Sequence, residues 1–278
     1  MPVTVVIENR GRRISDVTTM VSIRQGDEYS DNIFPNQYAR VVDLPQDATL
    51  RFQFTVFAAS DLHPLEVSLV KDSRPLFRQS FDLRRAMVEK PVLMVASHKI
   101  SRIFMSSFLG HYAQASVLPE YLPDQWYGYQ GVSKMILSAG VMSRLTQTQY
   151  KALKDWVQNG GTLIVSGDIN TRVFFQDRIK DLLDGIRVTG IFKTDQLSGM
   201  SEFLGISDTA TGEFWMNRLQ SGGARVLAAE QDQPVLLLKK IGDGSLVFVS
   251  IDIHQPDFLR WEGIRDFWLK ILNIPGPE

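Results

Sequence analysis

The residues best suited to chemistry in this chain follow short apolar runs in its second half. Ser166, Gly167 and Asp168 form a turn of small and polar residues, and Asp252 and His254 follow a later apolar run. A serine hydroxyl with a histidine base and a carboxylate is the arrangement of nucleophilic hydrolases. The turn does not match the G-x-S-x-G elbow on which the serine of α/β-hydrolases lies. The pattern therefore favours a structural turn, in which small residues end a buried strand and His254 caps a loop.

Polar residues at the predicted strand ends have three further interpretations. His98, Asp168 and His254 lie where ligands collect in open α/β sheets, but the four histidines show no H-x-H or H-x-x-x-H spacing. The histidine spacing thus argues against a metal site, and the sequence indicates no cofactor. Asp168 and Asn170 could bind a small ligand, yet both are ordinary helix caps, and capping is favoured because a helix is predicted to begin near Asn170. The candidate ligand or partner site at the strand ends comprises His98, Ser166, Gly167, Asp168, Asn170, Asp252 and His254.

An aromatic segment precedes one of the predicted strands. Trp126, Tyr127 and Tyr129 lie close together after a Leu-Pro-Asp loop. Exposed aromatic side chains at this density can form a stacking platform or a partner-binding patch. The alternative, which is favoured, is that Trp126 and Tyr129 cover a sheet edge or a domain junction. The three residues are kept as a candidate contact loop.

Composition and charge exclude several classes of protein. The chain of 278 residues has no cysteine, which excludes a disulfide framework, thiolate metal sites and a cysteine nucleophile. Thirty basic and 31 acidic residues argue against a nucleic-acid partner. No glycine-rich phosphate loop supports nucleotide binding. No apolar run approaches the roughly 18 residues of a membrane helix, so membrane association is expected only through segments that this chain lacks.

The first third of the chain has the alternation of a sheet with one buried face. Apolar and polar residues alternate strictly in Leu50–Val56. Similar segments, separated by turn residues, predict strands at 3–9, 17–24, 38–44, 49–57, 65–70 and 76–83. The sequence predicts an antiparallel β-sandwich of immunoglobulin-like type over residues 1–88.

From residue 89 the pattern changes to alternating strands and helices. Pro91–Ser97 is a continuous apolar run, typical of a strand buried on both faces. Strands are predicted at 115–118, 134–138 and 162–166, and a helix at 146–158 begins with a Thr146–Gln149 capping box. A second helical face comprises Ile103, Phe104, Phe108, Leu109 and Tyr112. This alternation predicts a doubly wound, flavodoxin-like α/β domain over residues 89–278.

The end of the chain departs from this alternation. Gly242–Gly244 is a hairpin turn signal between two apolar runs, so an antiparallel pair is expected at one side of the sheet. A last helix from about Glu262 should dock on the core through Ile264, Phe267, Trp268, Ile271 and Leu272. The region from Leu183 to Gly223 is the least regular and predicts an insertion of loops with one or two short helices.

Three segments of the second half carry a resemblance to a known superfamily. They are Trp126–Ser138, Leu145–Gly167 and Gly242–Asp252 with the later Trp261-Glu-Gly. Over roughly residues 90–273 the chain resembles the class I glutamine amidotransferase-like superfamily, in particular uncharacterised bacterial envelope proteins with a β-sandwich before such a domain. An active member has a nucleophilic cysteine at the elbow that matches Ser166 best, and a histidine–glutamate pair near the position of His254. This chain has no cysteine, and Gln255-Pro256 follows the histidine instead of glutamate.

The sequence therefore favours a non-catalytic binding or scaffold module over an enzyme. The resemblance implies a degenerate domain of the bacterial cell envelope, on the extracytoplasmic face, with unidentified protein partners; a cytoplasmic location is the alternative. The competing function is a hydrolase or transferase that uses Ser166 and His254. The two hypotheses differ in whether a histidine lies within hydrogen-bond reach of a serine hydroxyl.

Overall fold

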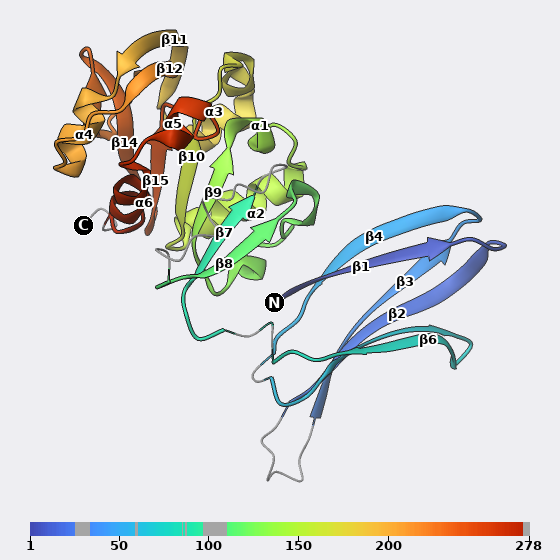
Figure 1. The fold of residues 1–278 in the computed structure, drawn as a ribbon. Helices are drawn as coiled ribbons and strands as arrows, with labels where there is room; N and C mark the ends of the chain where they lie inside the picture. The colour runs from blue at the N-terminus through green and yellow to red at the C-terminus, as the bar shows by residue number, and fades with distance from the viewer. Residues whose placement is uncertain (26–33, 59–60, 85, 87, 97–109, 275–278) are drawn as a thin grey trace. The chain divides into compact units, whose positions relative to one another are not determined.

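The chain consists of a β-rich unit followed by an α/β unit. The computed structural model describes residues 1–25, 34–58, 61–84, 86, 88–96 and 110–274. Contacts between Cα atoms divide the chain into Met1–Glu89 with Tyr127–Gln130, and Lys90–Trp126 with Gly131–Glu278 (Figure 1). No helix in the described part of the chain is long and apolar enough to span a bilayer.

The N-terminal unit contains two antiparallel sheets. One consists of β1 (Pro2–Asn9) and β4 (Ala48–Thr55). The other has the order β3-β2-β5-β6, formed by Phe34–Leu44, Ile14–Gln25, Leu65–Lys71 and Arg74–Phe81. Alternate residues of both sheets form one apolar core, which includes Val5, Ile7, Val21, Ile23, Phe54 and Val67. These strands agree with the alternation seen in the sequence.

The α/β unit is built on a seven-stranded sheet of order β13-β14-β15-β10-β9-β7-β8. The strands from β15 to β8 are parallel, and β13 and β14 are antiparallel to their neighbours. The strands are β7 (Val92–Ala96), β8 (Ala113–Val117), β9 (Val132–Ser138), β10 (Thr162–Ser166), β13 (Arg225–Glu230), β14 (Gln233–Ile241) and β15 (Gly244–Val249). Buried apolar residues line the central strands, as the continuous apolar runs predict.

The predicted hairpin and capping box are both confirmed. Gly242 adopts a φ of 61° in the turn between β14 and β15, and a Cβ at Gly244 would lie 2.0 Å from the carbonyl oxygen of Val157. Helix α2 (Gln147–Gln158) begins with the capping box of Thr146 and Gln149. The Gln149 side chain also donates to the carbonyl oxygens of Pro119 and Leu122. The cap therefore fixes a neighbouring loop as well as the helix.

Short helices complete the α/β unit. They are α1 (Ala139–Met142), α3 (Asp177–Leu183), α4 (Ser198–Leu204), α5 (Pro256–Arg260) and α6 (Ile264–Leu272), with the 3-10 helices η3 (Pro119–Tyr121), η4 (Trp126–Tyr129) and η5 (Thr171–Phe175). The last of the α-helices, α6, buries Phe267, Trp268, Ile271 and Leu272 as predicted. The helical residues predicted at 103–109 lie outside the described residues, and Tyr112 precedes β8.

The prediction of loops with one or two short helices from Leu183 to Gly223 is wrong about the loops, whereas one short helix, α4, is present. The region contains two ten-residue antiparallel strands, β11 (Arg187–Gln196) and β12 (Thr211–Gln220), with α4 between them. Figure 1 shows β12 next to β14, with β11 on the far side of β12. Two register shifts, at Val188/Gly190 and Thr194/Gln196, interrupt the pairing. Because each shift breaks the two-residue period, the alternation is hard to recognise in the sequence.

Candidate functional site

Ser166 is buried at the carboxyl end of β10. Its hydroxyl donates to the carbonyl oxygen of Gly167 at 3.4 Å. Among the described residues, this is the hydrogen bond that the structure records for the hydroxyl, and none joins it to His254. A serine hydroxyl needs a base within hydrogen-bond reach to be activated for attack, and no such bond to Ser166 is recorded among the described residues.

Gly167 joins the carboxyl ends of β10 and β15. Its N–H donates to the carbonyl oxygens of Val249, at 2.6 Å, and Ile251, at 3.1 Å. A Cβ at this position would lie 2.2 Å from the carbonyl oxygen of Ser250. The turn therefore requires glycine because another backbone segment occupies the space of a side chain.

The side chain of Asn217, in the middle of β12, holds the backbone of Asp168. Its Oδ1 accepts from the Asp168 N–H at 3.0 Å, and its Nδ2 donates to the Asp168 carbonyl oxygen at 2.9 Å. The Asn217 N–H donates to the carbonyl oxygen of Ser250 at 2.8 Å. Through its side chain and its backbone, the buried Asn217 thus links β12 to Asp168 and to Ser250, which are far apart in the sequence.

Gln255 makes a similar pair of side-chain bonds to the backbone of β12. Its Oε1 accepts from the Trp215 N–H at 2.9 Å, and its Nε2 donates to the Trp215 carbonyl oxygen at 2.6 Å. Sequence reasoning did not single out Gln255 or Asn217 as site residues. The signal for Asn217 was its place in the largely apolar segment Phe214–Leu219, but the region was predicted to form loops.

The exposed polar residues of the strand ends mostly bond to nearby backbone. Asp168 Oδ1 accepts from the Asn170 N–H at 2.8 Å, and Asn170 Oδ1 accepts from the Arg172 N–H at the start of η5. The predicted capping role of Asn170 is confirmed. Asp252 Oδ1 accepts from the His254 N–H at 2.9 Å, so this contact does not orient the imidazole ring.

The geometry around Ser166 leaves no oxyanion hole in the turn. In nucleophile-elbow enzymes, the N–H of the residue after the nucleophile binds the oxyanion. Here the N–H of Gly167 and the N–H of Asp168 are both bound within the fold. Ser166 and Gly167 are buried, so they cannot contact a ligand as the candidate site requires; Asp168, Asn170, Asp252 and His254 remain accessible.

The described residues at the strand ends form no metal-binding group. His98 lies outside the described residues. Among the residues that are described, no three histidine or acidic side chains are placed to hold a metal ion.

The aromatic segment forms the 3-10 helix η4. Trp126 and Tyr127 are 38% and 40% exposed, whereas Tyr129 is fully buried. Tyr129 is therefore not part of an exposed contact platform. The prediction of a contact loop is limited to Trp126 and Tyr127.

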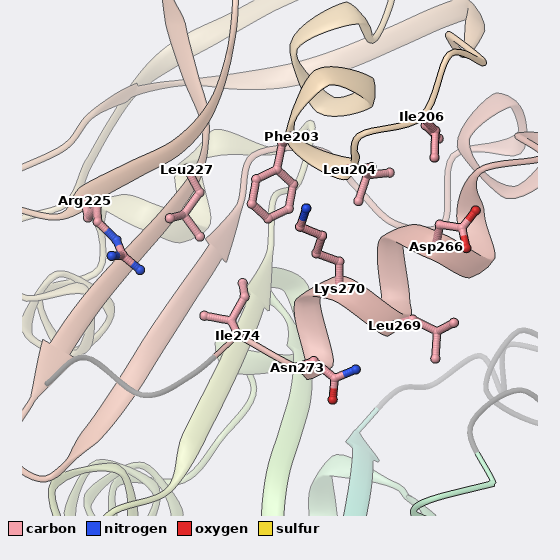
Figure 2. Close-up of a pocket in the computed structure, with 10 residues that line it drawn as sticks. All are labelled: Phe203, Leu204, Ile206, Arg225, Leu227, Asp266, Leu269, Lys270, Asn273 and Ile274. Carbon is pink, nitrogen blue, oxygen red and sulfur yellow. The ribbon is translucent and has the colours of Figure 1, made fainter.

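An apolar groove runs between α4, α6 and the edge strand β13. Figure 2 shows Phe203, Leu227 and Ile274 around the side chain of Lys270, with Arg225 at one end of the groove and Asp266 near the other. Its volume is about 650 Å³. The Nζ of Lys270 lies 5.0 Å from the centre of the Phe203 ring. Neither Lys270 nor Arg225 forms an ion pair within the described residues, and Asp266 is the one acidic residue of the lining, so the groove combines apolar walls with two cations and one anion.

Helix α4, one wall of this groove, is held by the buried carboxylate of Glu230. Its Oε1 accepts from the Met200 N–H at 2.8 Å in the first turn of α4. Burial raises the pKa of Glu230, although hydrogen bonds from Gly199, Met200 and Ser198 oppose the shift. The protonated form is therefore favoured more in the folded chain than in the unfolded chain.

This shift gives the stability a specific pH dependence. The pKa of Glu230 is higher in the folded chain than in the unfolded chain, so the folded chain binds more protons at pH values between these two pKa values. The contribution of Glu230 to stability is therefore lost as the pH rises through the folded pKa. Glu230→Gln removes this titration. We expect the free energy of unfolding of wild type minus that of the variant to fall from pH 4 to pH 8, measured by urea denaturation at each pH. A difference that is constant or rises with pH would contradict the assignment.

Comparison with known proteins identifies the fold more clearly than the activity. Residues 1–84 match a family model described as a domain of unknown function (DUF8726). This match covers less than half of the chain. No curated protein matches the chain in sequence.

Solved structures with a similar fold include two proteins from Salmonella typhimurium that are described as cytoplasmic proteins. The first is 12% identical, with a TM-score of 0.52, and the match covers 68% of this chain and 100% of that one. The second, from strain LT2, is 12% identical, with a TM-score of 0.51, and the match covers 67% and 99% of the two chains. An exo-β-1,4-mannosidase from Opitutaceae bacterium strain TAV5 is 14% identical at a TM-score of 0.45, over 66% of this chain and 36% of that one. At such identities the likeness concerns the fold alone.

Proposed function

We propose that this chain is a non-catalytic binding or scaffold module that contains a degenerate class I glutamine amidotransferase-like domain. The observation that carries the proposal is the closed turn at Ser166. The N–H groups of Gly167 and Asp168 are bound by Val249, Ile251 and Asn217, so they are not available to an oxyanion. The elbow of an amidotransferase needs both a thiolate and free donors, and this turn offers neither.

The strand order supports the finer description of both units. Numbered along the chain, the parallel strands β8-β7-β9-β10-β15 have the order 2-1-3-4-5, which is the order of flavodoxin-like sheets. Two antiparallel sheets around one apolar core support an immunoglobulin-like sandwich for the N-terminal unit. Both descriptions belong to the proposal.

The groove beside α6 supports a binding role. Its walls are apolar, and Arg225 and Lys270 have no ion-pair partner among the described residues. A partner that fits this chemistry is a protein segment with apolar side chains and one carboxylate, because the acid would offset the net positive charge left by Arg225, Lys270 and Asp266 as the apolar groups fill the groove. Such a segment agrees with the protein partner expected from the sequence.

Two lines of support differ on where the module acts. The resemblance favours the bacterial cell envelope, whereas the two Salmonella proteins, which are described as cytoplasmic, favour the cytoplasm, the alternative location. We propose the cytoplasmic location, because these two proteins match over their whole length. Fractionation of cells that express the tagged chain distinguishes the two.

The non-catalytic assignment predicts no turnover of amides or esters. Purified wild type should show no glutaminase or esterase activity above buffer in a broad substrate screen, because Ser166 lacks a base and an oxyanion donor. Ser166→Ala and His254→Ala are tested beside it as matched controls. Turnover in wild type that both substitutions abolish would establish the competing hydrolase function instead.

A further inference from the structure

The outer edge of β6 is exposed along its whole length. All eight residues of Arg74–Phe81 are exposed, and no strand among the described residues pairs with their outer edge. Three of the exposed side chains are large and apolar: Leu76, Phe77 and Phe81. An edge strand with unpaired backbone groups and apolar side chains is a template for another strand.

The aromatic side chains of β6 lie on the core face of their sheet. Phe77 and Phe81 pair with Leu69 and Leu65 of β5, and directly paired residues share a face. Leu65 is buried in the core, yet Phe77 and Phe81 are 48% and 42% exposed. The facing two-stranded sheet therefore covers β5 but does not cover β6.

The irregularity of the β6 edge is confined to the start of the strand. The pairing with β5 has one register shift, between Leu69 and Val70, where Pro75 lies, and it is regular over the five consecutive pairs from Leu65↔Phe81 to Leu69↔Phe77. The edge strand β13 has two register shifts within six residues. Because bulges twist an edge away from incoming strands, β13 is better protected against strand addition than the Phe77–Phe81 part of β6.

We propose that β6 pairs antiparallel with β6 of a second copy of this chain, about a two-fold axis through Gln79. In this register, Phe77 lies opposite Phe81 of the second copy, and Phe81 lies opposite Phe77. The four rings then form one cluster on the uncovered core face, with the two Gln79 amides at its centre. Backbone hydrogen bonds and the aromatic pairs stabilise the dimer, and the contact is self-complementary as a two-fold interface requires.

Neighbouring registers fit the strand less well. An axis through Arg78 places two guanidinium groups opposite each other, which is unfavourable. An axis through Ser80 moves the pairing of Phe77 to Leu83, beyond the end of β6. The axis through Gln79 keeps both aromatic residues paired inside the strand. This inference does not depend on whether the α/β unit is catalytic.

The absence of cysteine from this chain allows a test of both the dimer and its register. Gln79→Cys places two thiols next to each other on the axis, within disulfide distance. Mild oxidation should convert this variant to a covalent dimer on non-reducing gels. Ser80→Cys is the matched control: its side chain lies on the opposite face, and its partner is Arg78, so it should cross-link far less. Equal cross-linking of the two variants would overturn the register.

Solution mass tests the association without cysteine. Wild type should approach twice the 31.5 kDa of one chain by sedimentation or light scattering as its concentration rises. Gln79→Lys places two ammonium groups face to face and should shift the mass to that of a monomer. Val41→Lys is the control, because Val41 is 64% exposed on β3, at the other edge of the same sheet, and its change should leave the mass unchanged.

Circular dichroism checks that each variant is folded. A wild type that stays monomeric at every concentration, or a Gln79→Lys variant that stays dimeric, would overturn the proposal.

Discussion

Replacing Trp268 with alanine should lower the free energy of unfolding by about 3–5 kcal/mol, the usual cost of truncating a large buried aromatic residue. Trp268 is fully buried in α6. Its ring meets that of Phe267 edge-on at a centroid distance of 5.0 Å. Truncation therefore removes buried apolar surface and leaves a cavity that the surrounding strands cannot fill. Urea denaturation followed by circular dichroism measures the loss without relying on tryptophan fluorescence.

A matched aromatic truncation shows whether burial is the cause. Phe175 is 55% exposed in the same unit, so Phe175→Ala should cost about 0.5–1 kcal/mol. Trp268→Phe keeps an aromatic ring in place and should cost less than Trp268→Ala. Similar losses at residues 268 and 175 would contradict the placement of Trp268 in the core.

Replacing Gly167 with alanine should cost about 3 kcal/mol, at the upper end of overpacking effects. The added Cβ would lie 2.2 Å from the carbonyl oxygen of Ser250 and 2.5 Å from Oδ1 of Asn217. The first of these atoms belongs to backbone that is itself hydrogen-bonded, so it cannot move without breaking the contact between β10, β15 and β12. The free energy of unfolding from urea titration measures the cost.

Gly190 offers a control for the loss of glycine itself. It lies in β11, and a Cβ there would meet no atom within 4 Å. Gly190→Ala should therefore change stability by no more than about 0.5 kcal/mol, because the new methyl group enters open space. If Gly167→Ala were equally mild, the strand ends would not be closed as the structure indicates.

The parts of the fold that were predictable from the sequence rest on local signals. Thr146 and Gln149 occupy both ends of a reciprocal hydrogen bond, so a capping box can be recognised within four residues. Gly242 and Gly244 mark the β14–β15 turn in the same local way. The strictly alternating Leu50–Val56 predicts β4 because side chains of a strand alternate between faces.

The parts that were missed depend on distant residues. The β11–β12 pair is interrupted by two register shifts, so its alternation is broken in the sequence. Asn217 shows its role only when Asp168 and Ser250 are placed beside it. That the turn at Ser166 is structural could be predicted from the sequence, because the chain has no cysteine and the turn lacks the two glycines of the G-x-S-x-G elbow. It could not show which groups occupy the N–H donors, because the acceptors lie about 50 or more residues away in the chain.

The amide link at Asn217 also has a consequence for how this end of the molecule opens. Asp168 and Asn217 are 49 positions apart, and the amide of Gly167 is bound by carbonyl groups still further along the chain. The strand-end turn and β12 therefore belong to one cooperative unit, since β12 cannot leave without releasing the backbone of Asp168. In hydrogen exchange, the amide proton of Asp168 therefore reports on the undocking of the distant β11–β12 pair, whereas the amide proton of Gly167 reports on the contact with the end of β15.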